Sequence, residues 1–196
     1  MIFTSNPNQW RSLDDDGQIT YLVGLVARGS AELDGSTRMV YATLKGNDPR
    51  LGWKAPIPMT QRVEQMLESI EVAPELEDSD RELARAAVEG VLSAFQERNR
   101  YVHDSLMPSG EEQAAWFMNR LDLRKGETVP TSGRTSVAEL LECRKALSRG
   151  SWQMWALHKL ILVNRAGKGD AEAPRWRAML RGDFHLHDDD TISYSH

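Results

Sequence analysis

An arginine and a histidine five residues apart, Arg98 and His103, are the pair in this sequence best suited to phosphodiester chemistry. A guanidinium is a rigid fork that binds phosphate oxygens, and an imidazole can take or give a proton near neutral pH. Together the two groups suit phosphodiester cleavage without a metal ion. Asn99 directly follows the arginine.

The pair lies near the end of a predicted amphipathic helix. Its apolar stripe consists of Ala84, Val88, Val91, Leu92, Phe95, Val102 and Leu106. On a helical wheel Asn99 falls in the centre of this stripe, with Arg98 and His103 on its two edges. Residues five apart on a regular helix are offset by about 140° and about 7.5 Å of rise, so the pair does not point at one atom. A symmetric pairing of two such helices would remove this difficulty, because each cleft would then collect two arginines and two histidines.

The same three polar residues could instead simply end the helix. Arginine and histidine near a helix C-terminus offset the macrodipole and can bond the last carbonyls. Asn99 could then satisfy a backbone group inside a helical bundle. The spacing alone leaves both interpretations open.

The run Arg98-Asn99-Arg100-Tyr101-Val102-His103 resembles the Arg-four-residues-His motif of the HEPN superfamily. Members of that superfamily are helical bundles that commonly dimerise. Many are metal-independent ribonucleases of toxin–antitoxin, phage-defence and CRISPR systems, and some are non-catalytic scaffolds. The sequence departs from several branches at Asp104-Ser105, where they carry glycine or a nearby tyrosine.

The resemblance implies a metal-independent endoribonuclease that acts as a homodimer, as a toxin or a phage-defence effector. RNA would be its substrate, and an antitoxin or another protein would be a further partner. The catalytic residues would be Arg98, His103 and Asn99, and the asparagine would orient the histidine by a hydrogen bond or bind the substrate. The substrate-binding residues, beside the motif, would be Arg100, Tyr101 and Asp104. The alternative is a non-catalytic helical module of the same type that binds a nucleotide or a protein partner.

A second cluster, His185 and His187 followed by three aspartates at 188–190, has the composition of a metal site. Its neighbours predict no fixed element that could hold the ligands, so a polar tail explains it better. The sequence also has no phosphate-binding glycine loop, no hydrolase elbow and no paired-cysteine zinc motif. We therefore expect neither a metal nor a cofactor.

The composition is that of an ordinary globular protein. The chain has 196 residues, 40% of them hydrophobic and 27% charged, with a formal net charge of −5. Proteins that hold long nucleic acid by charge are usually basic, so RNA chemistry here would need a local site. The single cysteine, Cys143, excludes an intramolecular disulfide. The sequence shows no signal-peptide pattern and no apolar run long enough to cross a bilayer, so we expect a cytoplasmic protein with no membrane partner.

The hydrophobic period predicts the helices that must position the motif. A long helix begins near Ile19 and ends before Gly46, with a bend allowed near Gly29. The others begin at about Thr60, at the capping-box pattern Ser79/Glu82 and at the pattern Ser136/Glu139, the last with a break allowed at Gly150. The third helix is expected to run to about His103 or Leu106.

Residues 111–134 lack a helical period and form a small irregular or β-hairpin insert. We therefore predict a mainly α fold, a bundle of about four helices. A HEPN-like domain would span residues 1–166, followed by a polar C-terminal tail over residues 167–196.

Overall fold

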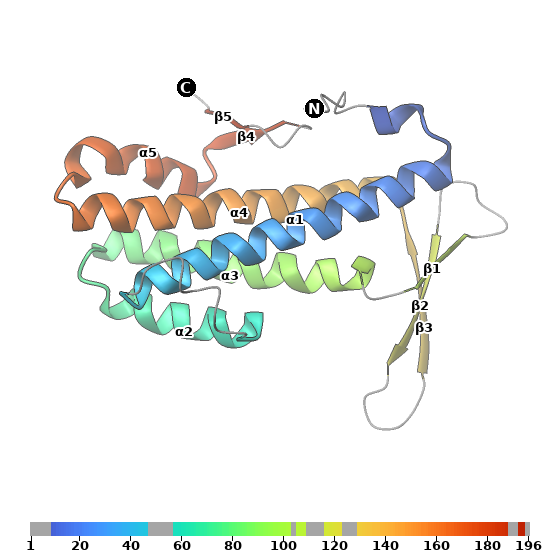
Figure 1. The fold of residues 1–196 in the computed structure, drawn as a ribbon, viewed down its shortest axis with the longest axis horizontal. Coiled ribbons are helices and arrows are strands. Elements are labelled where there is room, and N and C mark those ends of the chain that lie inside the picture. Colours follow the sequence, from blue (N-terminus) through green and yellow to red (C-terminus); the bar gives the residue numbers. More distant parts are fainter. Residues whose placement is uncertain are drawn as a thin grey trace, which may run out of the picture.

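The structure is a computed structural model, and it describes residues 9–46, 57–102, 105–108, 116–122, 129–187 and 192–194. It confirms the predicted fold class: a mainly helical bundle with a small antiparallel sheet at one end (Figure 1). The helices are η1 (Gln9–Ser12), α1 (Asp15–Leu44), α2 (Met59–Val72), α3 (Asp78–Val102), α4 (Val137–Arg165) and α5 (Gly169–Arg181). The strands are β1 (Ser105–Pro108), β2 (Trp116–Asp122), β3 (Val129–Thr135), β4 (Phe184–Leu186) and β5 (Ile192–Tyr194).

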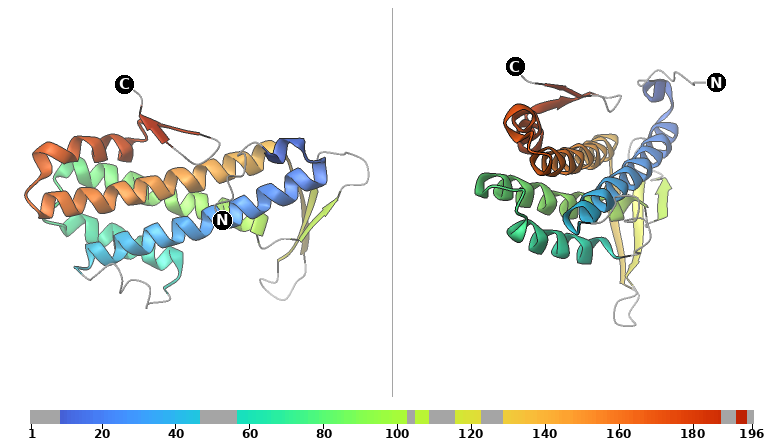
Figure 2. Two further views of the ribbon diagram at one scale, coloured as in Figure 1. Left: turned by 45° about the horizontal axis from the view of Figure 1, so that its top comes forward. Right: turned by 60° about the vertical axis from the view of Figure 1, so that its left-hand side comes forward.

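The bundle is built around α4, which lies beside α1 and between α3 and α5 (Figure 2). Helix α2 packs on α1 and α3. The apolar faces of these helices meet in one core. Its fully buried side chains include Ile19, Leu22, Leu33, Met66, Ile70, Leu76, Leu140, Leu147, Met154, Leu157 and Leu160.

The two longest helices run unbroken through the glycines at which the sequence allowed a bend or a break. A Cβ built on Gly150 would lie 3.2 Å from Leu33 Cδ1, and one built on Gly29 would lie 3.4 Å from Leu147 Cβ. Glycine therefore lets α1 and α4 approach each other at these points, and the low helix propensity of glycine does not end either helix. The predicted capping box of Ser136 and Glu139 opens α4 as expected.

The start of α3 differs from the prediction. The helix begins at Asp78, so Ser79 lies inside its first turn and does not serve as the cap. The amide of Arg81 donates to the carbonyl of Glu77, one residue before the helix. Acidic side chains at Asp78 and Asp80 favour the positive end of the helix dipole.

The C-terminal segment expected as a polar tail contains a helix that belongs to the bundle. Helix α5 buries Ala173, Trp176, Met179 and Leu180. Arg177 donates two hydrogen bonds, of 2.6 and 2.9 Å, to the fully buried carboxylate of Asp80 on α3. After α5 the chain forms the β4–β5 hairpin, and Phe184 on β4 is buried.

The predicted insert contains the β2–β3 hairpin, and β1 extends it into a three-stranded antiparallel sheet. Leu106, which the sequence placed on the apolar stripe of the third helix, pairs in β1 with Met118 of β2. Helix α3 therefore ends at Val102, three residues before the first strand. Arg98 and Asn99 lie in the last two turns of α3, just before this junction between bundle and sheet.

Across the described part of the chain, every helix is too short or too polar to cross a bilayer.

Candidate functional site

Arg98 lies on the central line of the buried face of α3, which we call the seam. Buried residues recur at alternating intervals of four and three, at Asp80, Ala84, Ala87, Val91 and Ala94, and again at Tyr101. Arg98 occupies the one seam position between Ala94 and Tyr101. The sequence predicted Asn99 at the centre and Arg98 at an edge, which is wrong. Small alanines mark the face that packs most closely, whereas Leu92 and Phe95, which dominated the predicted stripe, are only half-buried.

The guanidinium of Arg98 is held by its neighbours on α3. Its Cζ lies 5.1 Å from the centroid of the Phe95 ring, within the range of a cation–π contact. Its Nη1 donates a 2.9 Å hydrogen bond to Oδ1 of Asn99. Both side chains are half-buried. The structure therefore brings together two of the three predicted catalytic residues, with the asparagine as an acceptor for the arginine.

Burial lowers the pKa of Arg98. Electrostatic interactions with Cys143 and Asp34 raise this pKa and so offset part of the effect of burial. A guanidinium has so high an ordinary pKa that it stays charged after such a shift. Its positive charge is thus partly removed from water, which strengthens its attraction for an anion. A desolvated arginine near a helix end is suited to bind a phosphate that displaces the remaining water.

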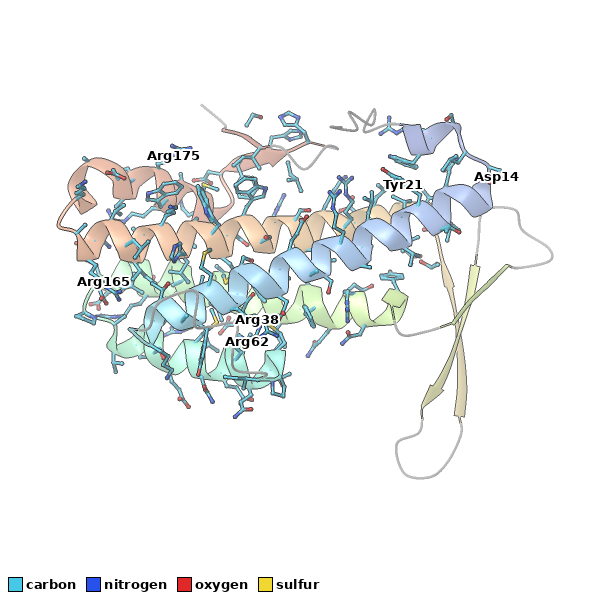
Figure 3. The ribbon with its side chains drawn as sticks, viewed as in Figure 1. Asp14, Tyr21, Arg38, Arg62, Arg165 and Arg175 are labelled. Carbon is cyan, nitrogen blue, oxygen red and sulfur yellow. The ribbon has the colours of Figure 1, made fainter. Side chains whose placement is uncertain are left out.

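Two further arginines lie around Asp34 of α1. Arg62 Nη1 donates to Asp34 Oδ1 across 2.6 Å, and Arg38 Nε donates to Asp34 Oδ2 across 2.7 Å. Figure 3 labels these two arginines where α1 passes over α2. Burial by itself would raise the pKa of Asp34, but the hydrogen bonds from Arg62 and Arg38 outweigh it and lower the pKa. Arg62 and Arg38 therefore hold the Asp34 carboxylate in its ionised form, and its charge raises the pKa of Arg98.

Tyr101, expected to contact the substrate, lies in the core with 2% of its surface exposed. Its hydroxyl donates a 3.0 Å hydrogen bond to Oε1 of Glu97, one turn earlier. This position gives the ring a packing role at the end of α3. His103, Asp104 and the side chain of Arg100 lie outside the described residues.

A groove beside this site was not predicted. It lies between α3 and α4 and has a volume of about 570 Å³. Its floor is made of small residues, and Glu97, Tyr101 and Cys143 line the end nearest the motif. The small residues Gly90, Ser93 and Ala94 recur at helical spacing on α3, as do Cys143, Ala146 and Gly150 on α4, and this spacing was the available signal. Hydrophobic-period analysis passes over them because glycine, serine and alanine carry little apolar weight.

The remaining sequence candidates have structural roles or incomplete ligand sets. His158 is buried, its Nδ1 lies 2.9 Å from Thr43 Oγ1, and burial lowers its pKa to about 4. His185 and His187 stand 4.8 Å apart between ring centroids. Among the described residues no group of three or more ligand side chains could hold a metal ion, and the aspartates at 188–190 lie outside them.

Comparison with family models, curated proteins and solved structures found no match to this chain.

Proposed function

We propose that this protein is a metal-independent endoribonuclease of HEPN type, in which Arg98 binds the scissile phosphate and His103 transfers protons. The observation that carries the proposal is the placement of Arg98. A charged guanidinium occupies a seam position of α3, where the preceding turns bury alanine and valine, and Phe95 and Asn99 hold it at the end of the helix. Removing part of a charged group from water in such a place is costly, and anion binding is a function that offsets this cost.

The reaction would be a transesterification within RNA. The ribose 2′-oxygen attacks the adjacent phosphorus, the bond from phosphorus to the 5′-oxygen breaks, and a 2′,3′-cyclic phosphate forms. One imidazole accepts the 2′-hydroxyl proton, and an imidazolium donates a proton to the leaving 5′-oxygen. Arg98 neutralises the negative charge that grows on the phosphoryl oxygens, and Asn99 keeps the guanidinium oriented.

A homodimer is part of this proposal. Because residues five apart on a regular helix are offset by about 140°, a twofold axis near the ends of two α3 helices would supply one histidine as base and another as acid. The net charge of −5 supports recognition of a structured RNA, or delivery by a protein partner such as an antitoxin, over charge-driven coating of long RNA. We propose a role as a toxin or phage-defence effector in the cytoplasm.

The test is cleavage of RNA by the purified protein in EDTA. We expect wild type to cut, and His103→Ala to abolish cutting without a change in the melting temperature. Arg98→Lys keeps the charge but loses the fork, and we expect it to lose most of the activity while remaining folded. His185→Ala, on the exposed β4 strand, is the matched control and should cut like wild type.

A non-catalytic module is the second candidate, and the partial burial of Arg98 on the packed face of α3 favours it. In that case wild type leaves RNA intact, and Arg98→Ala destabilises the fold. Cutting that persists at the wild-type rate in His103→Ala would also contradict the ribonuclease proposal.

A further inference from the structure

A second cleft, away from the Arg–His motif, opens between α1 and α4. Its volume is about 450 Å³, within the usual range for sites that enclose small molecules. Six described residues line it: Glu32, Ser36, Ser148, Ser151, Trp152 and Trp155. Two of these residues are tryptophans, and the other four carry a carboxylate or a hydroxyl group.

The two tryptophans form a rigid aromatic corner. Their ring centroids are 5.8 Å apart and their planes stand at 87°. Trp155 is braced from behind by Trp176 of α5, at 5.0 Å and 84°. Indole faces carry negative electrostatic potential and attract cations. Lys159 already shows this attraction, because its Nζ lies 5.4 Å from the centroid of Trp155.

Two of the three hydroxyl groups that line the cleft offer acceptor oxygens. Ser151 Oγ donates to Ser36 Oγ across 3.3 Å, and Ser36 Oγ donates to the carbonyl of Leu33 across 3.1 Å. Both hydroxyl hydrogens are therefore used inside the protein, and oxygen lone pairs face a ligand.

Glu32 adds the one formal charge among the described lining residues. Its side chain is 49% exposed and stands 3.4 Å from an Arg28 side chain that is 56% exposed. An ion pair this exposed is weak, so the carboxylate remains able to attract a second cation.

We propose that this cleft binds a small organic cation, an ammonium group that carries alkyl substituents. Two indoles set at right angles, hydroxyl acceptors and one carboxylate match the combination that recognises quaternary ammonium groups. The same set disfavours phosphate and carboxylate ligands, because the described lining residues include no cationic side chain. The inference is independent of the proposed ribonuclease activity, which uses the end of α3.

The experiment compares choline with 3,3-dimethylbutan-1-ol, the neutral carbon analogue of the same shape, by calorimetric titration of the whole protein. We expect saturable binding of choline, and binding of the neutral analogue that is weaker by roughly tenfold. Equal affinity for the two compounds would show that the cleft selects shape rather than charge and would overturn the proposal. Absence of saturable choline binding would overturn it as well.

Variants then assign the binding to this cleft. Glu32→Gln should weaken choline binding several-fold, whereas Glu64→Gln, an equal change of charge at an exposed position on α2, should leave it unchanged. Trp152→Phe keeps a ring but lowers the cation–π attraction, so it should also weaken binding while the melting temperature confirms the fold. Equal affinity in Glu32→Gln and Glu64→Gln would contradict the assignment.

A trimethyllysine peptide separates a free cation from one carried by a protein partner. If the peptide binds and choline does not, the small-molecule proposal fails.

Discussion

The guanidinium of Arg62, only 1% exposed, donates a 2.6 Å hydrogen bond to the carboxylate of Asp34 and so joins α2 to α1. Its Nη2 also donates to the carbonyl of Ile57, across 2.9 Å, just before α2 begins. One buried cation thus fixes both the start of α2 and its contact with the longest helix. The cost of burying Arg62 is offset only while Asp34 is ionised.

Asp34→Asn should therefore destabilise the protein strongly. The change leaves the charge of Arg62 buried without its counter-ion, and we expect a loss of about 2–4 kcal/mol in the free energy of unfolding. Chemical denaturation monitored by circular dichroism measures it. The control is Asp78→Asn, whose side chain is 99% exposed although it pairs with Arg81, and which should cost at most about 1 kcal/mol. Equal effects of the two changes would refute this role for Asp34.

Asn99→Ala tests how the proposed catalytic arginine is held. The change removes the acceptor of the 2.9 Å hydrogen bond from Arg98 and leaves the backbone of α3 intact. If the ribonuclease proposal holds, we expect RNA cleavage to slow by roughly 10- to 100-fold with little change in melting temperature, because the guanidinium loses orientation rather than charge. Gln96→Ala, exposed on the same helix, is the matched control and should cleave like wild type.

We expect the free energy of unfolding to fall in mild acid because of the buried His158. Its pKa is lowered to about 4 in the folded protein, against about 6.5 in an unfolded chain. The folded state binds fewer protons between these values, so the contribution is complete above pH 6.5 and falls by roughly 3 kcal/mol as the pH drops toward 4.

Unfolding free energies measured from pH 7.5 to pH 4.5 would show this slope. His158→Gln should be less stable at neutral pH, because the contact with Thr43 is disturbed, but its slope over this range should be smaller. His185→Gln, on an exposed strand, should keep the wild-type slope. An unchanged slope in His158→Gln would rule out this histidine as the source.

Gly150→Ala should destabilise the bundle, in contrast to the usual effect of this change within a helix. The added Cβ would meet Leu33 Cδ1 at 3.2 Å and Val91 Cγ2 at 3.8 Å, and both side chains are fully buried. We expect a loss of about 1 kcal/mol, since overpacking outweighs the gain in helix propensity. Gly24→Ala, where an added Cβ meets nothing within 4 Å, should instead gain up to about 1 kcal/mol. Thermal and chemical unfolding of the two variants compare them directly.

Much of the fold follows from local chemistry. The 3.6-residue period predicted α1, α2 and α4, and the capping box at Ser136 and Glu139 marked the start of α4. Prediction from the local sequence failed where burial of a segment depends on a contact with another helix. Trp176 lies among arginines in the sequence, so its segment was predicted to be a polar tail. In the structure Asp80 of α3 neutralises Arg177, and the segment packs on the bundle as α5 with Trp176 buried.

The candidate site was likewise predicted in part from the sequence, and the rest depended on the tertiary structure. Residue type and spacing alone identified Arg98 and Asn99 as chemical groups near the end of a helix, because these are properties of the chain itself. Their roles within the helix depended on the tertiary structure, since the side of α3 that is buried is set by how closely α1 and α4 approach its alanines. That approach puts Arg98, rather than Asn99, on the seam, because close packing between helices selects small side chains and not the largest apolar ones.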